Sequence, residues 1–241
     1  MRLRRLLVFV VLLASAAVPR FAEGKQHATR TRAQANGIAI LYAKGPFNRD
    51  YSAKATMSLP RDVGEQSWYS TWLMLVSNDA KSHRGFLQGG LIRWAGHRYA
   101  LSAFVAFRRP GGHLIFRDLG LLRSGPHRVQ IVGDRRLVRF IVDGRAIYRF
   151  RRSSIFLPGA APYLQVGAEV KKPYDRAVGT IWALQLKRDS DRRAAPWTPA
   201  CERYDRGLHF VRVHGRYIAD GYFLPSQPSG FIGCRDFAKK R

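Results

Sequence analysis

Short apolar runs of strand length, separated by glycine, proline and charged residues, fill the sequence from about residue 37 to residue 187. No helical periodicity extends beyond a turn or two, so the pattern favours β-structure. Residues 51–59 alternate apolar with polar side chains, and Pro60 ends that run. Asp143-Gly144 stands between two β-rich runs and predicts a two-residue hairpin turn. We therefore expect an all-β antiparallel sandwich or barrel, with strands at residues 51–59, 71–76, 86–92, 99–107, 114–117, 128–132, 137–142, 145–150, 163–170, 180–187, 208–214 and 217–223.

The first 17 residues have the features of a secretory signal peptide: a basic start, the apolar run 6–13 and small residues after it. The run is well short of the roughly 20 residues that span a bilayer. We expect cleavage near Ala16-Ala17, export from the cytoplasm, and no transmembrane anchor in the mature chain. Residues 18–36 then form a flexible leader, residues 37–187 the β-sandwich, residues 188–200 a linker and residues 201–241 a C-terminal extension.

The two cysteines, Cys201 and Cys234, both lie in the C-terminal extension. An even pair in an exported protein usually forms a disulfide. Its loop of 33 residues corresponds to roughly 3–4 kcal/mol of loop-closure entropy. We expect the bridge to pin this extension to the sandwich.

Two stretches of the chain resemble the concanavalin A-like lectin and glucanase superfamily. Residues 125–131 with 137–144 resemble its "G-x-H … D-G" hairpin, and residues 163–169 with 179–182 resemble its closing strands. The resemblance covers about residues 37–187 and implies a jelly-roll sandwich of two curved antiparallel sheets. It also implies a structural place for His127 in the hairpin.

The laminarinase-type members of that superfamily use an E-x-D-x-x-E strand motif, because retaining hydrolysis needs two carboxylates about 5 Å apart. None of the four glutamates of this chain has an Asp two residues on and a Glu five residues on. The sequence therefore disfavours glycoside hydrolysis of that type.

A second resemblance, to the glutamic peptidases, rests on residues 58–60, 72–75 and 86–90. Gln88 lies in an "L-Q-x-G" strand, and Glu169 follows at a suitable distance on another predicted strand. The resemblance implies that Glu169 acts as general base on a water while Gln88 orients that water and stabilises the oxyanion. The alternative is that both side chains belong to a polar sheet face in contact with water.

Strand alternation places Tyr163, Gln165 and Glu169 on one face of their strand. If that face is concave, Gln88 and these side chains line one groove. We predict the ligand-groove residues to be Trp72, Trp94, Tyr99, Tyr163 and Gln165.

The charge is strongly basic, with 42 Lys plus Arg, 16 Asp plus Glu and a formal net charge of +26. Arginine forks pair with phosphate, sulfate and carboxylate groups, so the excess is consistent with a polyanionic partner. The alternative is that the charge keeps the protein soluble. No cluster lies on a nucleic-acid motif, so we expect no specific nucleic-acid partner. We predict a basic rim at Arg108, Arg109, Arg149, Arg151 and Arg152.

These features favour an exported binding module, without catalysis, for a glycan or another anionic surface polymer. The main alternative is a glutamic-peptidase-like hydrolase that uses Gln88 and Glu169. A third is a structural envelope protein without a small ligand. The sequence has no recognisable metal motif and predicts no cofactor.

Overall fold

The computed structural model describes residues 37–43, 47, 50–61, 68–77, 85–94, 100–109, 111–156, 162–171, 177–188, 191–205, 208–221 and 230–232. In this part of the chain the regular secondary structure is β-strand apart from one short 3-10 turn, η1 (Arg152–Ser154). The signal peptide and leader lie outside the described residues, so their assignments stay predictions. None of the described helical segments has the length and apolar character needed to cross a membrane.

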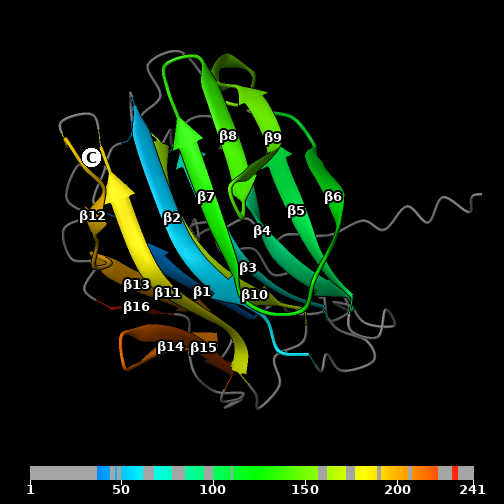
Figure 1. The fold of residues 1–241 in the computed structure, drawn as a ribbon, viewed down its shortest axis with the longest axis vertical. Helices are drawn as coiled ribbons and strands as arrows, with labels where there is room; N and C mark the ends of the chain where they lie inside the picture. Colours follow the sequence, from blue (N-terminus) through cyan, green and yellow to red (C-terminus); the bar gives the residue numbers. More distant parts are fainter. Residues whose placement is uncertain are drawn as a thin grey trace, which may run out of the picture.

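Two antiparallel layers pack face to face as a sandwich (Figure 1). The rear layer has the strand order β6-β5-β4-β3-β10-β1-β13, with β16 beside β13. Its bounds are β6 (Leu114–Leu122), β5 (Leu101–Arg108), β4 (Phe86–Trp94), β3 (Trp68–Ser77), β10 (Pro162–Val170), β1 (Gly37–Tyr42), β13 (Cys201–Asp205) and β16 (Gly230–Ile232). The front layer has the order β11-β2-β7-β8-β9, with β12 beside β11. Its bounds are β11 (Ala177–Lys187), β2 (Tyr51–Ser58), β7 (His127–Gly133), β8 (Leu137–Val142), β9 (Arg145–Arg151) and β12 (Ala195–Pro196).

The described part of the expected C-terminal extension belongs to these sheets. β13 pairs with β1 along five residue pairs, starting at Tyr42 and Cys201. The hairpin β14 (Leu208–Val213) and β15 (Arg216–Gly221) joins the layers, because β14 meets β13 at Leu208 and β15 pairs with β11. Cys201 is buried, whereas Cys234 lies outside the described residues, so their disulfide stays a prediction.

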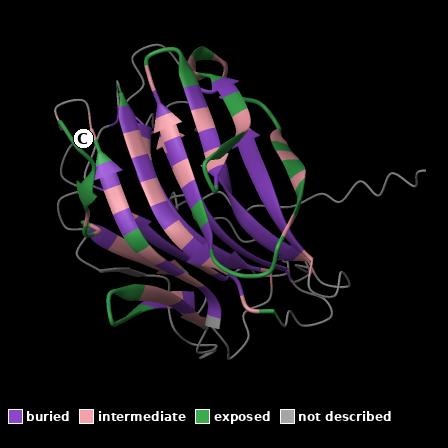
Figure 2. Cartoon of the chain, viewed as in Figure 1, coloured by how far each residue is buried: buried purple, intermediate pink, exposed green. Residues whose placement is uncertain are grey.

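The core lies between the layers and follows the period of two expected for strands half-buried on one face. On β2, Tyr51, Ala53, Ala55 and Met57 are buried while the residues between them are partly exposed (Figure 2). This confirms the alternation predicted from the sequence. Across the core, the ring of Phe107 on β5 packs against aromatic rings of β9.

The predicted hairpin turn at Asp143-Gly144 is confirmed. Both residues have positive φ, 50° and 83°, which is the conformation of a type I′ turn. His127 Nδ1 lies 2.6 Å from Asp143 Oδ2, and the Arg128 N–H donates to Asp143 Oδ1 at 2.9 Å. Burial raises the pKa of Asp143, but the hydrogen bonds from His127 and Arg128 outweigh it, so the net pKa is lowered. His127 therefore has the structural place in the hairpin that the sequence implied.

Candidate functional site: the aromatic face of the rear layer

The rear layer carries a second apolar cluster on the face turned away from the core. Its buried members are Ile40, Trp68, Trp72, Phe86, Ile92, Phe104 and Ala106, and partly buried side chains of the same layer pack against them. All of these residues come from β1, β3, β4, β5 and β6. We call this surface, together with the same face of β10, the aromatic face.

One row of cross-strand neighbours on the aromatic face carries two amides. Gln165 on β10 is directly opposite Met74 on β3, and Met74 is directly opposite Gln88 on β4. Both glutamines are buried, at 6% and 3% exposure. Gln88 and Gln165 are thus two strand spacings apart, with only the half-buried thioether of Met74 between them. The complete row is Tyr42, Gln165, Met74, Gln88, Ala106 and Phe116.

The next row contains Trp72 between two glycines, Gly167 on β10 and Gly90 on β4. A Cβ on Gly167 would lie 2.4 Å from two ring carbons of Trp72 and 2.9 Å from Cε2, the carbon bonded to Nε1. The indole therefore lies over Gly167, with its polar edge close to β10. A Cβ on Gly90 would lie 2.0 Å from the backbone oxygen of Thr71, so β3 and β4 approach closely there.

Glu169 lies one row further along β10, opposite Ser70 of β3, and is 2% exposed. Gln88 and Glu169 are therefore on one face, as predicted, but they are not direct neighbours. They are separated by four residues along β3 and by two strand spacings, which corresponds to about 16 Å between Cα atoms. Trp72 occupies the row between them. Neither side chain lies on a surface in contact with water, so the alternative of a solvated polar face is wrong.

Two buried polar atoms of the aromatic face have no hydrogen-bond partner among the described residues. They are the indole Nε1 of Trp72, a donor, and the amide Oε1 of Gln165, an acceptor. Buried polar groups are nearly always hydrogen-bonded, and an unsatisfied one costs about 1–3 kcal/mol. Gly167 is directly opposite Trp72, and Gln165 precedes Gly167 by two residues on the same face of β10. The Trp72 donor and the Gln165 acceptor therefore lie in adjacent rows.

Half-exposed aromatic side chains border this buried centre. Trp94 lies opposite Trp68 on β3, and its ring packs edge-on against Phe116 at 5.6 Å. Tyr163 lies on the same face as Gln165, two residues away on β10. Of the predicted groove residues, Trp72, Trp94, Tyr163 and Gln165 therefore lie on one face, and Tyr99 lies outside the described residues.

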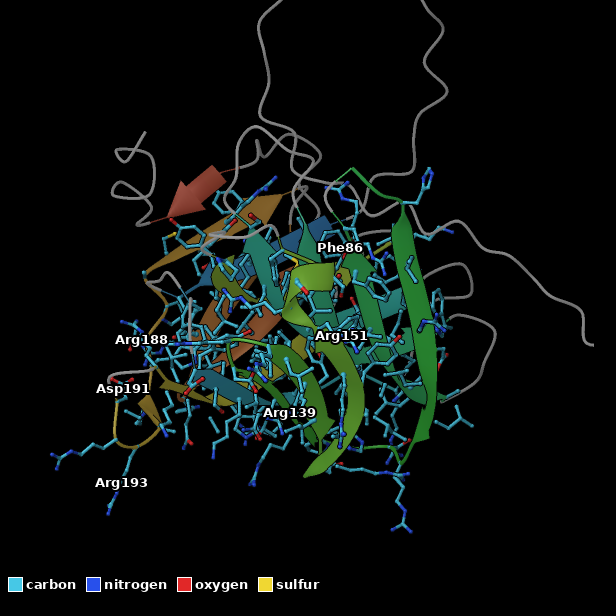
Figure 3. All side chains as sticks on the ribbon, turned by 90° about the horizontal axis from the view of Figure 1, so that it is seen from above. Phe86, Arg139, Arg151, Arg188, Asp191 and Arg193 are labelled. Carbon is cyan, nitrogen blue, oxygen red and sulfur yellow. The ribbon has the colours of Figure 1, made fainter. Side chains whose placement is uncertain are left out.

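The five arginines predicted to form a basic rim do not lie together. The guanidinium of Arg108 lies over the Phe86 ring at 5.6 Å, at one end of the aromatic face, and Arg109 follows it. Arg149 and Arg151 lie on the outer face of β9 in the front layer, and Arg152 donates to the Phe47 carbonyl. Figure 3 shows the labelled Phe86 and Arg151 in different layers. The prediction of one rim was wrong, because alternation along β9 turns its arginines away from the rear layer.

Sequence reasoning missed Tyr42, Met74 and Phe116, which complete the amide row. The signal for Met74 was available, because it alternates with Trp72 and shares its face. Tyr42 and Phe116 depend on sheet order, which the sequence does not contain. Among the described residues no three His, Cys, Asp or Glu side chains gather as metal ligands.

Neither a protein-family model nor a curated protein matches this sequence. Solved structures similar to the chain include glutamic peptidases, an alginate lyase and glycosyl hydrolase family proteins. Scytalido-glutamic peptidase with a transition-state analogue matches 77% of this chain and 97% of its own, at 9% identity and a TM-score of 0.48. An alginate lyase from Pseudomonas aeruginosa matches 60% of this chain and 68% of its own (16% identity, TM-score 0.43). A family 16 glycosyl hydrolase from Mycobacterium smegmatis matches 54% and 57% (14% identity, TM-score 0.37).

Proposed function

We propose that this protein binds an extended glycan or other anionic polymer along the aromatic face of its rear layer. The observation that carries the proposal is the pair of unsatisfied polar atoms, Trp72 Nε1 and Gln165 Oε1, in the middle of a face bordered by aromatic rings. A donor next to an acceptor suits a ligand hydroxyl, which accepts one hydrogen bond and donates another. A predominantly apolar site with a few placed polar groups is the usual composition of a ligand site.

Each part of the face has a distinct role in this proposal. Sugar rings stack on Trp94 and Tyr163, whose rings are partly exposed. Gln88 and Gln165 hydrogen-bond ring substituents between these platforms. Arg108 pairs with an acidic group at the end of the face, because a guanidinium binds carboxylate or sulfate in a forked geometry.

Ligand entry requires a side chain to move, since the two unsatisfied atoms are closed to solvent. Met74 is suited to this movement. It is directly opposite Gln165 and two residues from Trp72 on the same face, and it is partly exposed. Methionine is unbranched and changes rotamer readily, so its movement exposes Trp72 Nε1 and Gln165 Oε1 to a ligand at a small cost in free energy.

A second candidate function is hydrolysis by Glu169 and Gln88. The specific observation in its favour is that a buried carboxyl and a buried amide share this face. For one water to touch both side chains, their ends must approach to hydrogen-bonding distance of that water. The separation of about 16 Å between their Cα atoms, estimated from strand spacings, instead favours contacts at two points on an extended ligand.

We further propose that the chain is exported after cleavage near Ala16-Ala17 and that Cys201 pairs with Cys234. Mass spectrometry of the mature protein under non-reducing conditions tests both statements. The expected result is a new N-terminus after residue 16 or 17 and a mass two hydrogens below that of the reduced chain.

The binding proposal is tested with a panel of neutral and acidic polysaccharides in isothermal titration calorimetry. Trp94→Ala removes a platform on the aromatic face, and Trp182→Ala is the matched control. Trp182 is also partly exposed but lies in the front layer, where Arg216 covers its ring at 5.1 Å. We expect at least a tenfold loss of affinity in Trp94→Ala and no change in Trp182→Ala. Equal affinities in all three proteins would place binding elsewhere.

The hydrolase candidate has its own assay, cleavage of a peptide library from pH 2 to pH 8. Glu169→Gln is the informative variant, because it keeps the shape of the side chain and removes its basicity. Cleavage by the wild type alone would replace the binding proposal with the hydrolase. Salt-sensitive polymer binding that Glu169→Gln leaves intact, without cleavage, supports binding.

A further inference from the structure

Arg93, near the C-terminal end of β4, is a buried charge without a described counter-charge. Its position alternates with Leu91 on the core face, and its cross-strand neighbours Tyr69 and Leu101 belong to the core. The residue is 1% exposed, and neither Nε nor Nη1 has a hydrogen-bond partner within the described ranges. An ionised group removed from water is costly unless it is paired and hydrogen-bonded.

A second unsatisfied donor lies beside this guanidinium. Thr71 Oγ1 is fully buried and makes no hydrogen bond to the described part of the chain. Thr71 precedes Leu73 on the core face of β3 and lies two residues from Tyr69, the cross-strand partner of Arg93. Such diagonal neighbours are about 7–8 Å apart, within reach of a long side chain.

The front layer brings a second arginine to the same end of the sandwich. A Cβ on Gly179 of β11 would lie 2.5 Å from Thr71 Cγ2 and 3.2 Å from Leu59 Cδ2, so Thr71 abuts the chain just after β2. Arg61 follows Leu59 by two residues and is exposed. Burial lowers the pKa of Arg93, and the positive charge of Arg61 lowers it further. The positive charge of Arg61 therefore acts on the buried positive charge of Arg93.

We propose that Arg93, Thr71 and Arg61 form a binding site for a small oxyanion, either phosphate, sulfate or a carboxylate. The guanidinium of Arg93 supplies a positive charge and N–H donors, and Thr71 supplies a hydroxyl. The exposed Arg61 provides the second positive charge at the solvent side, where an ion enters. The anion neutralises the buried charge and accepts hydrogen bonds from the Arg93 guanidinium and the Thr71 hydroxyl.

The strands around Arg93, which are β3, β4 and β5, contain no Asp or Glu. Asp143 pairs with His127 and Asp134 with Arg139, beside β7 and β8 of the front layer. The chain as a whole has 42 basic and 16 acidic residues, so cations greatly outnumber carboxylates. An external anion can supply the counter-charge that the described residues around Arg93 lack. This site is separate from the aromatic face, because Arg93 and Thr71 point to the core side of the rear layer.

The test is thermal unfolding of the full mature chain in sodium phosphate, sulfate or acetate, each against sodium chloride at equal ionic strength. Arg93→Met removes the charge and keeps a long side chain, and Thr71→Val removes only the hydroxyl. Arg149→Met, on the outer face of β9, is the matched control. We expect wild-type Tm to rise by about 5–10 °C at an anion concentration near 100 times Kd.

The variants decide whether the rise comes from this site. Arg93→Met loses the rise and melts higher than wild type in chloride, because the uncompensated charge is gone. Thr71→Val raises the anion Kd about tenfold in calorimetry, as expected for the loss of a hydrogen bond to a charged ligand. If Arg93→Met does not fold, this variant alone tests whether the anion binds at this site. Arg149→Met keeps the full rise. An identical rise in every variant, or no rise above chloride in wild type, would overturn the site.

Discussion

Adding one methyl group at Gly167 tests the geometry on which the proposed site depends. A Cβ there would lie 2.4 Å from Cζ2 and Cη2 of Trp72 and 2.9 Å from Cε2. These distances are far inside van der Waals contact, and the indole is 1% exposed, so it has little room to retreat. Overpacking of this kind costs about 1–3 kcal/mol. We therefore expect Gly167→Ala to lower the free energy of unfolding by that amount.

Trp72→Phe supplies the second arm of a double-mutant cycle. A phenyl ring has no atoms at the Cζ2 and Cη2 positions, so the methyl group introduced by Gly167→Ala fits beside it. The smaller ring leaves a cavity, and Trp72→Phe alone costs about 1–3 kcal/mol. The double variant should be more stable than additivity predicts, with a coupling energy of about 1–2 kcal/mol.

Urea unfolding of the four proteins, followed by far-ultraviolet circular dichroism, measures this cycle. Gly112→Ala is the control, since its Cβ would meet its nearest neighbours at 3.4 Å and should change stability by less than about 0.5 kcal/mol. A neutral Gly167→Ala, or strict additivity in the double variant, would refute the position of the indole over β10.

Three further substitutions have outcomes fixed by the same structure. Gly90→Ala places a Cβ 2.0 Å from the Thr71 backbone oxygen, and because backbone yields less than a ring, urea unfolding should show a loss at or above about 3 kcal/mol. Tyr51→Phe removes a buried hydroxyl that has no partner among the described residues, and it should raise stability by about 1 kcal/mol. Burial raises the pKa of Tyr51 above its ordinary value of 10.0, so the hydroxyl ionises more readily in the unfolded chain than in the folded one. As pH rises above 10, urea unfolding should therefore show a larger loss of stability in wild type than in Tyr51→Phe. Asp143→Asn should lower the free energy of unfolding by less than about 1 kcal/mol, since the carboxylate is half exposed. The pKa of Asp143 is lowered in the folded protein. The stability difference between wild type and Asp143→Asn should therefore disappear as pH falls through that pKa.

The strand pattern could be predicted where, as in β2, one face of a strand is buried and the other is partly exposed. Residues 51–59 and the Asp143-Gly144 turn required only the period of two and the preference of turn residues for positive φ. The short strands β1 and β13 were not distinguished, since their pairing depends on residues more than 150 positions apart. Such pairing is set by sheet order, which local sequence does not encode.

The sequence could predict which side chains share a face of their strand, but not which side chains of neighbouring strands lie opposite one another. Alternation placed Gln165 and Glu169 on one face of their strand, and the structure places Gln88 and Trp72 of the neighbouring strands on that face as well. Alternation could not give the register that puts Gln88 opposite Met74 and Glu169 opposite Ser70. The basic rim failed for the same reason, because Arg108 lies on the rear layer and Arg149 and Arg151 lie on the outer face of the front layer.

The indole N–H resonance of Trp72 tests the central claim, that the aromatic face receives a ligand hydroxyl. Trp72→Phe assigns this resonance in a ¹⁵N–¹H spectrum, and Trp182, in the front layer, serves as the internal reference. On addition of the polysaccharide that binds best, we predict a downfield shift of the Trp72 signal that saturates with the calorimetric Kd, while the Trp182 signal stays in place. A saturating titration that leaves the Trp72 signal unmoved would contradict the account.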